Sequence, residues 1–260
     1  MDDPDHKTRV TRADIAGGVR TLGLPEGALV QVHSSLSQLG YVEGGAGAVV
    51  DALLETVGPR GTVMVPTFNH GKADIYDPRT TPSVSGAVTE ALRKRPDACR
   101  SIHPTHPYAA IGPDAEWLVE GHLEVETFDP KSPLGKLATR GGYVLLLGVG
   151  MRANTAAHIG ESMAHVHCIG FNRFPRRVRL DDGRVIPAWS VVWRDGPCLI
   201  EWQPLEDRMR SRGQIRSGRI GLGEAHLMLA RDVVDTAHEM TFELCPACPT
   251  RPDWASLARG

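Results

Sequence analysis

The chain has 260 residues, of which 41% are hydrophobic and 23% are charged. This composition is typical of a globular protein, and it excludes a disordered chain, a collagen-like fibre and a coiled coil. Lys and Arg number 29 against 31 Asp and Glu, which gives a formal net charge of -2. Such a balance gives no indication of a nucleic-acid partner or an anionic membrane surface.

The sequence also indicates the cellular compartment in which the protein is expected. No apolar run approaches the ~20 residues that span a bilayer, and the polar, acidic start at residues 1–15 is unlike a signal peptide. Five cysteines are too few for a disulfide scaffold. We therefore expect a cytoplasmic protein with reduced thiols.

The N-terminal part alternates helix and strand. Residues 11–19 have helical spacing behind a threonine N-cap, and residues 28–33 form a buried strand that ends at a serine pair. A helix over 44–57 and a second strand over 61–66 follow. This strand, helix and strand order predicts a right-handed parallel crossover.

A Pro-, Asp-, Thr- and Gly-rich segment at 67–85 is expected to be a long functional loop. Beyond it the hydrophobic pattern predicts alternating elements: helices over 84–93, 115–121, 134–139 and 156–165, and strands over 101–111 and 142–149.

The pattern then changes. An Asp-Gly turn at 182–183 predicts a hairpin within an antiparallel β insertion over about 170–200, and helical spacing returns over 223–240. With no repeat or linker evident, we expect a single α/β domain over 1–260. Its central sheet is predicted to be largely parallel or mixed and flanked by helices.

The first candidate for chemistry lies on the helix after the strand at 142–149. His158, Glu161 and His165 share one helical face. A carboxylate beside an imidazole fixes the tautomer and raises the basicity, as a general base requires. Two alternatives stay open: a simple surface ion pair, and a zinc site formed by the three side chains.

The second candidate is the turn His33-Ser34-Ser35, where hydroxyl and backbone N–H groups can contact a ligand carbonyl or phosphate. A helix cap is the alternative. The third is the segment Ser101 to Pro107, in which two His-Pro steps hold the chain extended. It predicts either one wall of a channel or a rigid edge strand.

Cys245 and Cys248 form a Cys-x-x-Cys pair, which is half of a structural zinc site. Two further ligands would be needed, so a reduced, incidental pair is the alternative.

The order of these segments resembles the aminoglycoside 3-N-acetyltransferase family over roughly residues 12 to 240. The landmarks are Val32-His-Ser-Ser-Leu-Ser-x-Leu-Gly, Gly44-Gly45, Gly58-Pro-x-Gly-Thr-Val-Met-Val-Pro-Thr-Phe, Thr81-Pro-Ser, Arg100-Ser-Ile-His-Pro-Thr-His-Pro, Ser132-Pro-Leu-Gly-Lys-Leu, Leu145-Leu-Leu-Gly-Val and Asn154-Thr-Ala-Ala-His-Ile-Gly-Glu.

The resemblance implies an α/β fold, acetyl-CoA as the donor, and an acceptor that is a primary amine: the 3-amino group of an aminoglycoside, or a related amino sugar. It implies that His158 is the catalytic base and that Glu161 supports it. By the same resemblance the loop at 67–85 walls the acceptor site, with Asn69 and Asp77 as substrate contacts. The implied coenzyme contacts are His33, Ser34, Ser35, Thr67, Ser101, His103 and Pro104.

Direct transfer in a ternary complex is the expected route, because the reaction needs no covalent acyl-enzyme. Neither Ser34 nor Ser35 lies in a Gly-x-Ser-x-Gly elbow. Three alternatives remain: an acetyltransferase for a biosynthetic amine that is not an aminoglycoside, a coenzyme-binding protein without acceptor activity, and a zinc hydrolase. The sequence is compatible with a homodimer.

Overall fold

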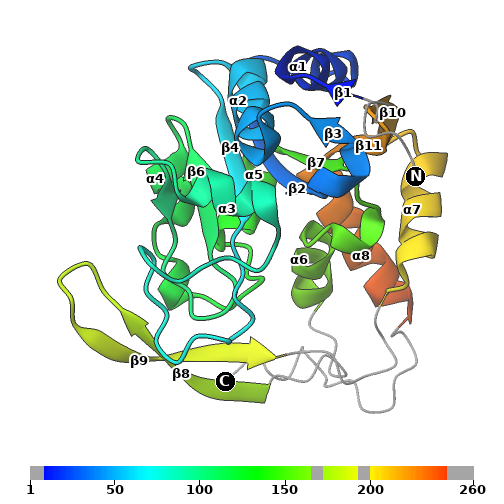
Figure 1. Ribbon diagram of the computed structural model, residues 1–260. Coiled ribbons are helices and arrows are strands. Elements are labelled where there is room, and N and C mark those ends of the chain that lie inside the picture. The colour runs from blue at the N-terminus through cyan, green and yellow to red at the C-terminus, as the bar shows by residue number, and fades with distance from the viewer. Residues whose placement is uncertain (1–8, 165–171, 193–199, 245–260) are drawn as a thin grey trace, which may run out of the picture.

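The computed structural model describes residues 9–164, 172–192 and 200–244. Its centre is a seven-stranded sheet in the order β10-β11-β7-β2-β4-β6-β5 (Figure 1). In that order the strands are Arg216–Ile220, Gly223–Leu229, Tyr143–Leu147, Leu29–Ser34, Thr62–Pro66, Tyr108–Ile111 and Cys99–Arg100. A two-stranded sheet pairs β1 (Arg9–Val10) with β3 (Tyr41–Val42).

The sheet is mixed, as the sequence predicted, and its parallel part is confined to the middle. β2 pairs in parallel with β4 on one side and with β7 on the other. The remaining pairings are antiparallel. The carboxyl ends of β2, β4 and β7 therefore meet at one edge, where open α/β sheets commonly bind ligands.

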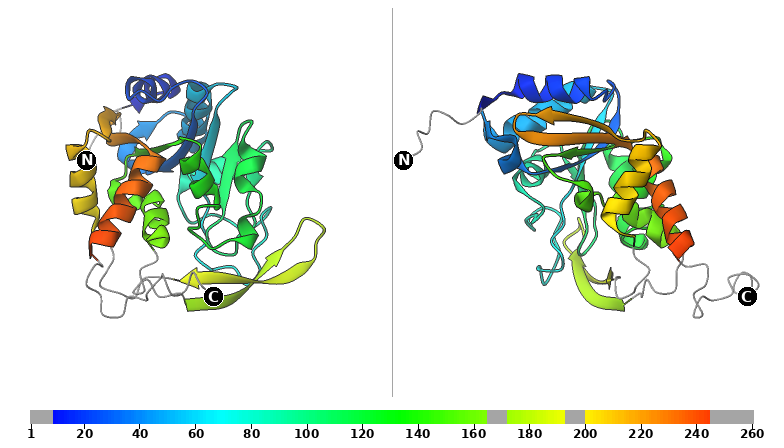
Figure 2. Two further views of the ribbon diagram at one scale, coloured as in Figure 1. Left: turned by 180° about the vertical axis from the view of Figure 1, so that it is seen from behind. Right: turned by 90° about the vertical axis from the view of Figure 1, so that its right-hand side faces the viewer.

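Helices cover both faces of the sheet (Figure 2), because alternate residues of each strand point to opposite sides. Val30 and Val32 pack into one cluster, with α1 (Arg12–Thr21), α2 (Gly45–Val57) and α3 (Ala87–Arg93). Val144 and Leu146 pack into the other. The helices of that second layer are α4 (Ala115–Val119), α5 (Pro133–Thr139), α6 (Ala156–Met163), α7 (Trp202–Ser211) and α8 (Ala230–Leu244).

The first half of the chain follows its sequence pattern closely. Thr11 caps α1 in a capping box with Asp14, since its hydroxyl accepts from the Asp14 N–H and its own N–H donates to the Asp14 carboxylate. The predicted crossover is present as β2, α2 and β4 in parallel. Short 3-10 turns complete the connections at Leu36–Leu39, His122–Glu124 and Met151–Ala153.

Two predicted elements were wrong in part. Gly223–Leu229 is strand β11 rather than the start of a helix, and α8 begins only at Ala230. Glu, Ala, Leu and Met favour helix locally, but pairing with β7 and β10 on either side overrides that preference. In the strand predicted over 101–111, only Tyr108–Ile111 pairs as a strand.

The predicted antiparallel insertion is a separate hairpin of β8 (Asn172–Arg179) and β9 (Val185–Val192), at the lower end of the molecule in Figure 1. Its turn uses Gly183 at a φ of 87°, a conformation that glycine adopts without strain. Tyr76, from the long loop, forms a parallel bridge with Val178 and is completely buried there. The hairpin is thus attached to the loop at 67–85.

Arg100 holds the other side of that loop. Its guanidinium donates to the Thr67 hydroxyl and to the carbonyls of Thr67, Pro78 and Thr81, at 2.6–3.2 Å. Four bonds from one planar cation fix the path of a segment that has no helix or strand of its own.

Helix α6 lies close against α8, and Gly160 permits the approach. A Cβ at this position would collide with the Val234 carbonyl and lie 2.8 Å from the Ala237 Cβ. The position of α6 relative to the sheet edge therefore depends on the absence of a side chain at residue 160.

We predict that Gly160→Ala lowers the free energy of unfolding by about 1–3 kcal/mol, because overpacking outweighs the gain in helix propensity. Gly47→Ala is the matched control: it lies inside α2 with no atom within 4 Å of the added Cβ, and it should be neutral or stabilising. Denaturant unfolding measures both. Equal stability of the two variants would contradict the prediction.

Candidate active site

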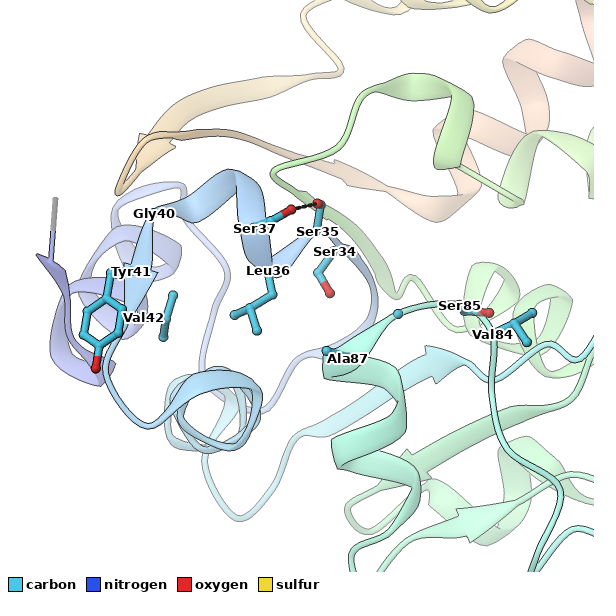
Figure 3. Close-up of a pocket in the computed structure, with 11 residues that line it drawn as sticks. Ser34, Ser35, Leu36, Ser37, Gly40, Tyr41, Val42, Val84, Ser85 and Ala87 are labelled. Carbon is cyan, nitrogen blue, oxygen red and sulfur yellow. Dashed lines mark hydrogen bonds between the residues drawn. The ribbon is translucent and has the colours of Figure 1, made fainter. Parts of the chain in front are cut away.

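Two cavities open at the edge where the parallel strands end. The outer cavity has a volume of about 690 Å³ and lies between the serine segment after β2 and the start of α3 (Figure 3). Hydroxyl and apolar groups alternate along it. Its lining residues are Ser34, Ser35, Leu36, Ser37, Gly40, Tyr41, Val42, Val84, Ser85, Gly86 and Ala87.

The inner cavity, of about 300 Å³, adjoins the outer one, because Ser34 and Ser85 line both. The end of β2 and the segments that follow β4 and β7 all contribute to it. Its other lining residues are His33, Pro66, Phe68, His70, Thr89, Val149, Arg152, Ala153 and Thr155.

His158 and Glu161 form the pair that the sequence predicted. His158 Nδ1 lies 2.7 Å from Glu161 Oε2, and the carboxylate is completely buried whereas 13% of the imidazole side chain is exposed. The second oxygen, Oε1, accepts from the Ile200 N–H at 3.3 Å. The bond between Nδ1 and Oε2 fixes the orientation of the His158 ring and directs its Nε2 away from the Glu161 carboxylate.

Aromatic rings link His158 to the inner cavity. Its ring centroid lies 5.0 Å from that of Phe128 and 5.4 Å from that of Trp202. Phe128 in turn lies 5.6 Å from His106, and His106 lies 4.7 Å from Phe68, which lines the cavity. His158 itself lines neither of these two cavities, and the rings of Phe128 and His106 lie between it and Phe68.

Burial keeps the neighbouring histidines neutral. It lowers the pKa of His33 to about 3, with a further contribution from the charge of His158. The pKa of His122 is also lowered to about 3, mainly by burial, and those of His103 and His106 lie well below the usual value for the same reason. These four rings are hydrogen-bonding and packing groups at physiological pH.

Three predicted coenzyme contacts lie at the cavities. His33 lines the inner one, Ser35 lines the outer one, and Ser34 lines both. Ser35 donates its N–H to the Leu147 carbonyl at 3.0 Å, which joins the turn to the end of β7. Its hydroxyl lies 3.3 Å from that of Ser37 (Figure 3).

The other four lie behind the cavities, in a buried polar network. Thr67 bonds the Pro107 carbonyl, and the Ser101 hydroxyl accepts from the Tyr108 N–H. His103 Nδ1 accepts from the N–H groups of Thr105 and His106. None of these residues, nor Pro104, lines either of the two cavities.

The two predicted substrate contacts are also engaged elsewhere. Asn69 is buried, donates to the Pro104 carbonyl at 3.0 Å and accepts from the Gly71 N–H at 2.8 Å. Asp77 lies 3.3 Å from Arg179 of β8. Both side chains thus stabilise the loop at 67–85 through contacts within it or with neighbouring segments.

Sequence reasoning missed Thr155, Phe128 and Trp202. The hydroxyl of Thr155 lies 3.3 Å from His33 Nε2 and 3.2 Å from Gln31 Nε2. One signal was available, because Thr155 precedes His158 by three residues and so shares its helical face. The two rings come from distant segments that have no local signature.

Among residues 9–164, 172–192 and 200–244, no group of three or more His, Cys, Asp or Glu side chains is arranged to hold a metal ion. Cys245, Cys248 and His165 lie outside the described residues. The two zinc sites that the sequence left open use these residues, and both therefore stay predictions. In the described part of the chain, no helix is long and apolar enough to cross a membrane.

Known proteins are similar in sequence to this chain over most of its length. The model of the aminoglycoside 3-N-acetyltransferase family matches residues 31–241. Aminoglycoside N(3)-acetyltransferase VII of Streptomyces paromomycinus is 34% identical over 258 residues, covering 87% of this chain and 89% of the relative. Aminoglycoside N(3)-acetyltransferase IV of Salmonella sp is 32% identical over 235 residues, covering 87% and 85%.

Solved structures agree in fold. Aminoglycoside acetyltransferase AAC(3)-Xa superposes with a TM-score of 0.83 at 29% identity, covering 90% of this chain and 93% of that one. AAC-IIIb in a binary complex with CoASH gives 0.78 at 25% identity, covering 89% and 96%. AAC-VIa bound to sisomicin gives 0.80 at 26% identity, covering 89% and 97%.

The family match therefore spans both cavities and the His158–Glu161 pair, and the relatives above 30% identity align over nearly all of their own length. We conclude that this chain belongs to the aminoglycoside 3-N-acetyltransferase family of acyltransferases.

Proposed function

We propose that this protein transfers the acetyl group of acetyl-CoA to a primary amine of an aminoglycoside, at the 3-amino group, with His158 as general base. The observation that carries the proposal is the His158–Glu161 pair on α6, one helical turn beyond Thr155, which lines the inner cavity. Family membership supports the reaction class.

The lining of the outer cavity supports its assignment to the coenzyme. A pantetheine arm alternates amide groups with short apolar stretches, and the outer cavity offers serine hydroxyls beside Leu36, Val42 and Val84. We assign His33, Ser34 and Ser35 to this arm and its thioester, since they lie where the outer cavity meets the inner one. A CoASH-bound structure among the similar proteins supports the assignment.

Acetyl-CoA supplies a thioester whose carbon–sulfur bond breaks as a carbon–nitrogen bond to the acceptor forms. An ammonium group has no lone pair, so the acceptor must first lose a proton. That first proton is released to solvent. As the neutral amine attacks, the nitrogen of the adduct carries one proton too many, and His158 accepts it at Nε2, because Nδ1 is held by Glu161. His158 then delivers this second proton to the departing sulfur. The buried carboxylate stabilises the imidazolium in between.

The acceptor class rests on the relatives, of which one solved structure is bound to sisomicin. One observation favours a second candidate, an amine of lower positive charge. The described lining of the inner cavity includes Arg152 and His70 and no carboxylate side chain, whereas a polycation is bound best where carboxylates gather.

The reaction is tested by measuring thiol release from acetyl-CoA with a panel of aminoglycosides, simple amino sugars and monoamines. We expect turnover with at least one aminoglycoside and a product acetylated at its 3-amino group, as read by NMR of the isolated product. Turnover confined to the monoamines would replace the aminoglycoside by the second candidate. Coenzyme binding in calorimetry without turnover of any amine would refute the proposed reaction.

His158→Ala is predicted to lower kcat by about 10²–10⁴, the usual contribution of a positioned general base. The KM for acetyl-CoA should change little, since the ring lies beyond the proposed coenzyme contacts. Steady-state kinetics with the best acceptor of the panel measures both. Retention of the wild-type kcat would remove His158 from this role.

Glu161→Gln is predicted to lower kcat by about 10-fold or more, because the amide keeps the shape of the carboxylate but not the charge that stabilises the imidazolium. Glu224→Gln is the matched control. Glu224 lies 3.6 Å from His226 in a second histidine–glutamate pair, on β11, with 77% of its side chain exposed. An equal loss in both variants would show that charge at Glu161 has no special role.

A further inference from the structure

Thr155 occupies an unusual place for a threonine at the start of a helix. It is the N-cap residue of α6, yet its hydroxyl makes no capping hydrogen bond. Asn154 supplies a bond there instead, accepting from the Ala156 N–H at 3.2 Å. The Thr155 side chain is turned toward the central strand β2 and lines the inner cavity.

Two buried polar side chains of β2 hold this hydroxyl. Gln31 is completely buried, and its Nε2 donates to Thr155 Oγ1 at 3.2 Å. His33 Nε2 lies 3.3 Å from the same oxygen. Buried polar groups in the middle strand of a sheet are costly unless they are paired, so their convergence on one hydroxyl calls for an explanation.

The hydrogen-bond roles follow from the donors. An amide nitrogen can only donate, so Thr155 Oγ1 accepts from Gln31. His33 remains neutral because burial lowers its pKa to about 3, and with its hydrogen on Nε2 it also donates to Oγ1. In that arrangement both lone pairs of the oxygen are engaged. The hydroxyl hydrogen then has two acceptors within its range: the buried Tyr108 hydroxyl, with which Thr155 interacts, and a ligand atom in the inner cavity, which Thr155 also lines.

We propose that the Thr155 hydroxyl donates a hydrogen bond to the carbonyl oxygen of the acetyl thioester, and that Gln31 and His33 position it for this role. The inference rests on the proposed function, since it requires acetyl-CoA in these cavities. It makes Thr155 a catalytic residue for the negative charge that develops on that oxygen as the amine attacks.

The placement on α6 supports the assignment. The His158 N–H donates to the Thr155 carbonyl at 3.1 Å, so the two residues lie one helical turn apart on the same face. One element thus presents a proton acceptor for the amine and a proton donor for the carbonyl oxygen. These are the two groups that acyl transfer to nitrogen requires on either side of the reacting carbon.

The charges around Thr155 are compatible with this division. When His158 takes up the acceptor proton, a second cation close by would oppose it. Burial and the charge of His158 lower the pKa of His33, so His33 stays neutral. It can hold the Thr155 hydroxyl without competing with His158 for the proton of the amine. Strand β2 therefore contributes only the neutral side chains of Gln31 and His33, and Arg152, from the segment after β7, is the cation in the lining of the inner cavity.

The inference is tested with Thr155→Val, which replaces the hydroxyl by a methyl group of similar size. We expect kcat to fall by about 10²–10³, the loss typical of one donor to a developing oxyanion, with the KM for acetyl-CoA changed less than about twofold. Thr155→Ser, which retains the hydroxyl, should keep most of the activity.

A spectroscopic measurement separates this role from a structural one. Infrared difference spectra of acetyl-CoA labelled with ¹³C at the carbonyl are recorded with the coenzyme bound and the acceptor absent. The carbonyl band should move to lower frequency in the wild type and in Thr155→Ser, and return toward its solution position in Thr155→Val. Thr155→Ala, measured beside it, deletes the same hydroxyl with a smaller side chain.

Thr56→Val serves as the control for loss of a buried threonine hydroxyl, because Thr56 bonds the Ala52 carbonyl inside α2. It should leave the carbonyl band and kcat unchanged. A band that stays shifted in folded Thr155→Val and Thr155→Ala would overturn the inference. Failure of the wild type to acetylate any amine would refute the proposed function instead, and the band would still report on Thr155.

Discussion

A single buried carboxylate constrains the design of this site. Glu161 has no exposed surface, and an unpaired carboxylate in such a position costs several kcal/mol. Its two oxygens are compensated by the His158 imidazole and by the Ile200 N–H. The segment just before α7 must therefore stay beside the middle of α6, and a separate close contact, of Gly160 with α8, fixes the position of α6 itself.

The three parallel strands explain why distant segments of the chain converge on the two cavities. The turn after β2 supplies the serines, the loop after β4 supplies Phe68 and His70, and the segment after β7 supplies Arg152 and Thr155. The outer antiparallel strands extend the sheet but end elsewhere. A site assembled from three strand ends needs a rigid centre, and the centre is β2, which is buried along nearly its whole length.

Local signals were enough for part of this arrangement. The His158–Glu161 pair lies three residues apart on one helix, and the serine turn directly follows a strand, so both were predictable from the sequence. Contacts across the chain were not. Thr155 and His33 are 122 residues apart, and β11 is a strand only because it pairs with β7 and β10. The Ser101 to Pro104 segment has the residue types of a binding site, but its polar atoms satisfy buried backbone groups instead.

The histidines show how burial sorts one residue type into two roles. His33, His103, His106 and His122 are held neutral by burial, and their nitrogen atoms bond to hydroxyls and backbone N–H groups. His158 alone among these five has a carboxylate on one nitrogen, which is the feature that stabilises an added proton. Neutral imidazoles give the site polar contacts without adding to the positive charge of Arg152, which lines the inner cavity. What distinguishes His158 from the other four is therefore the place of one carboxylate in the fold, and the number of histidines does not decide which of them is paired with it.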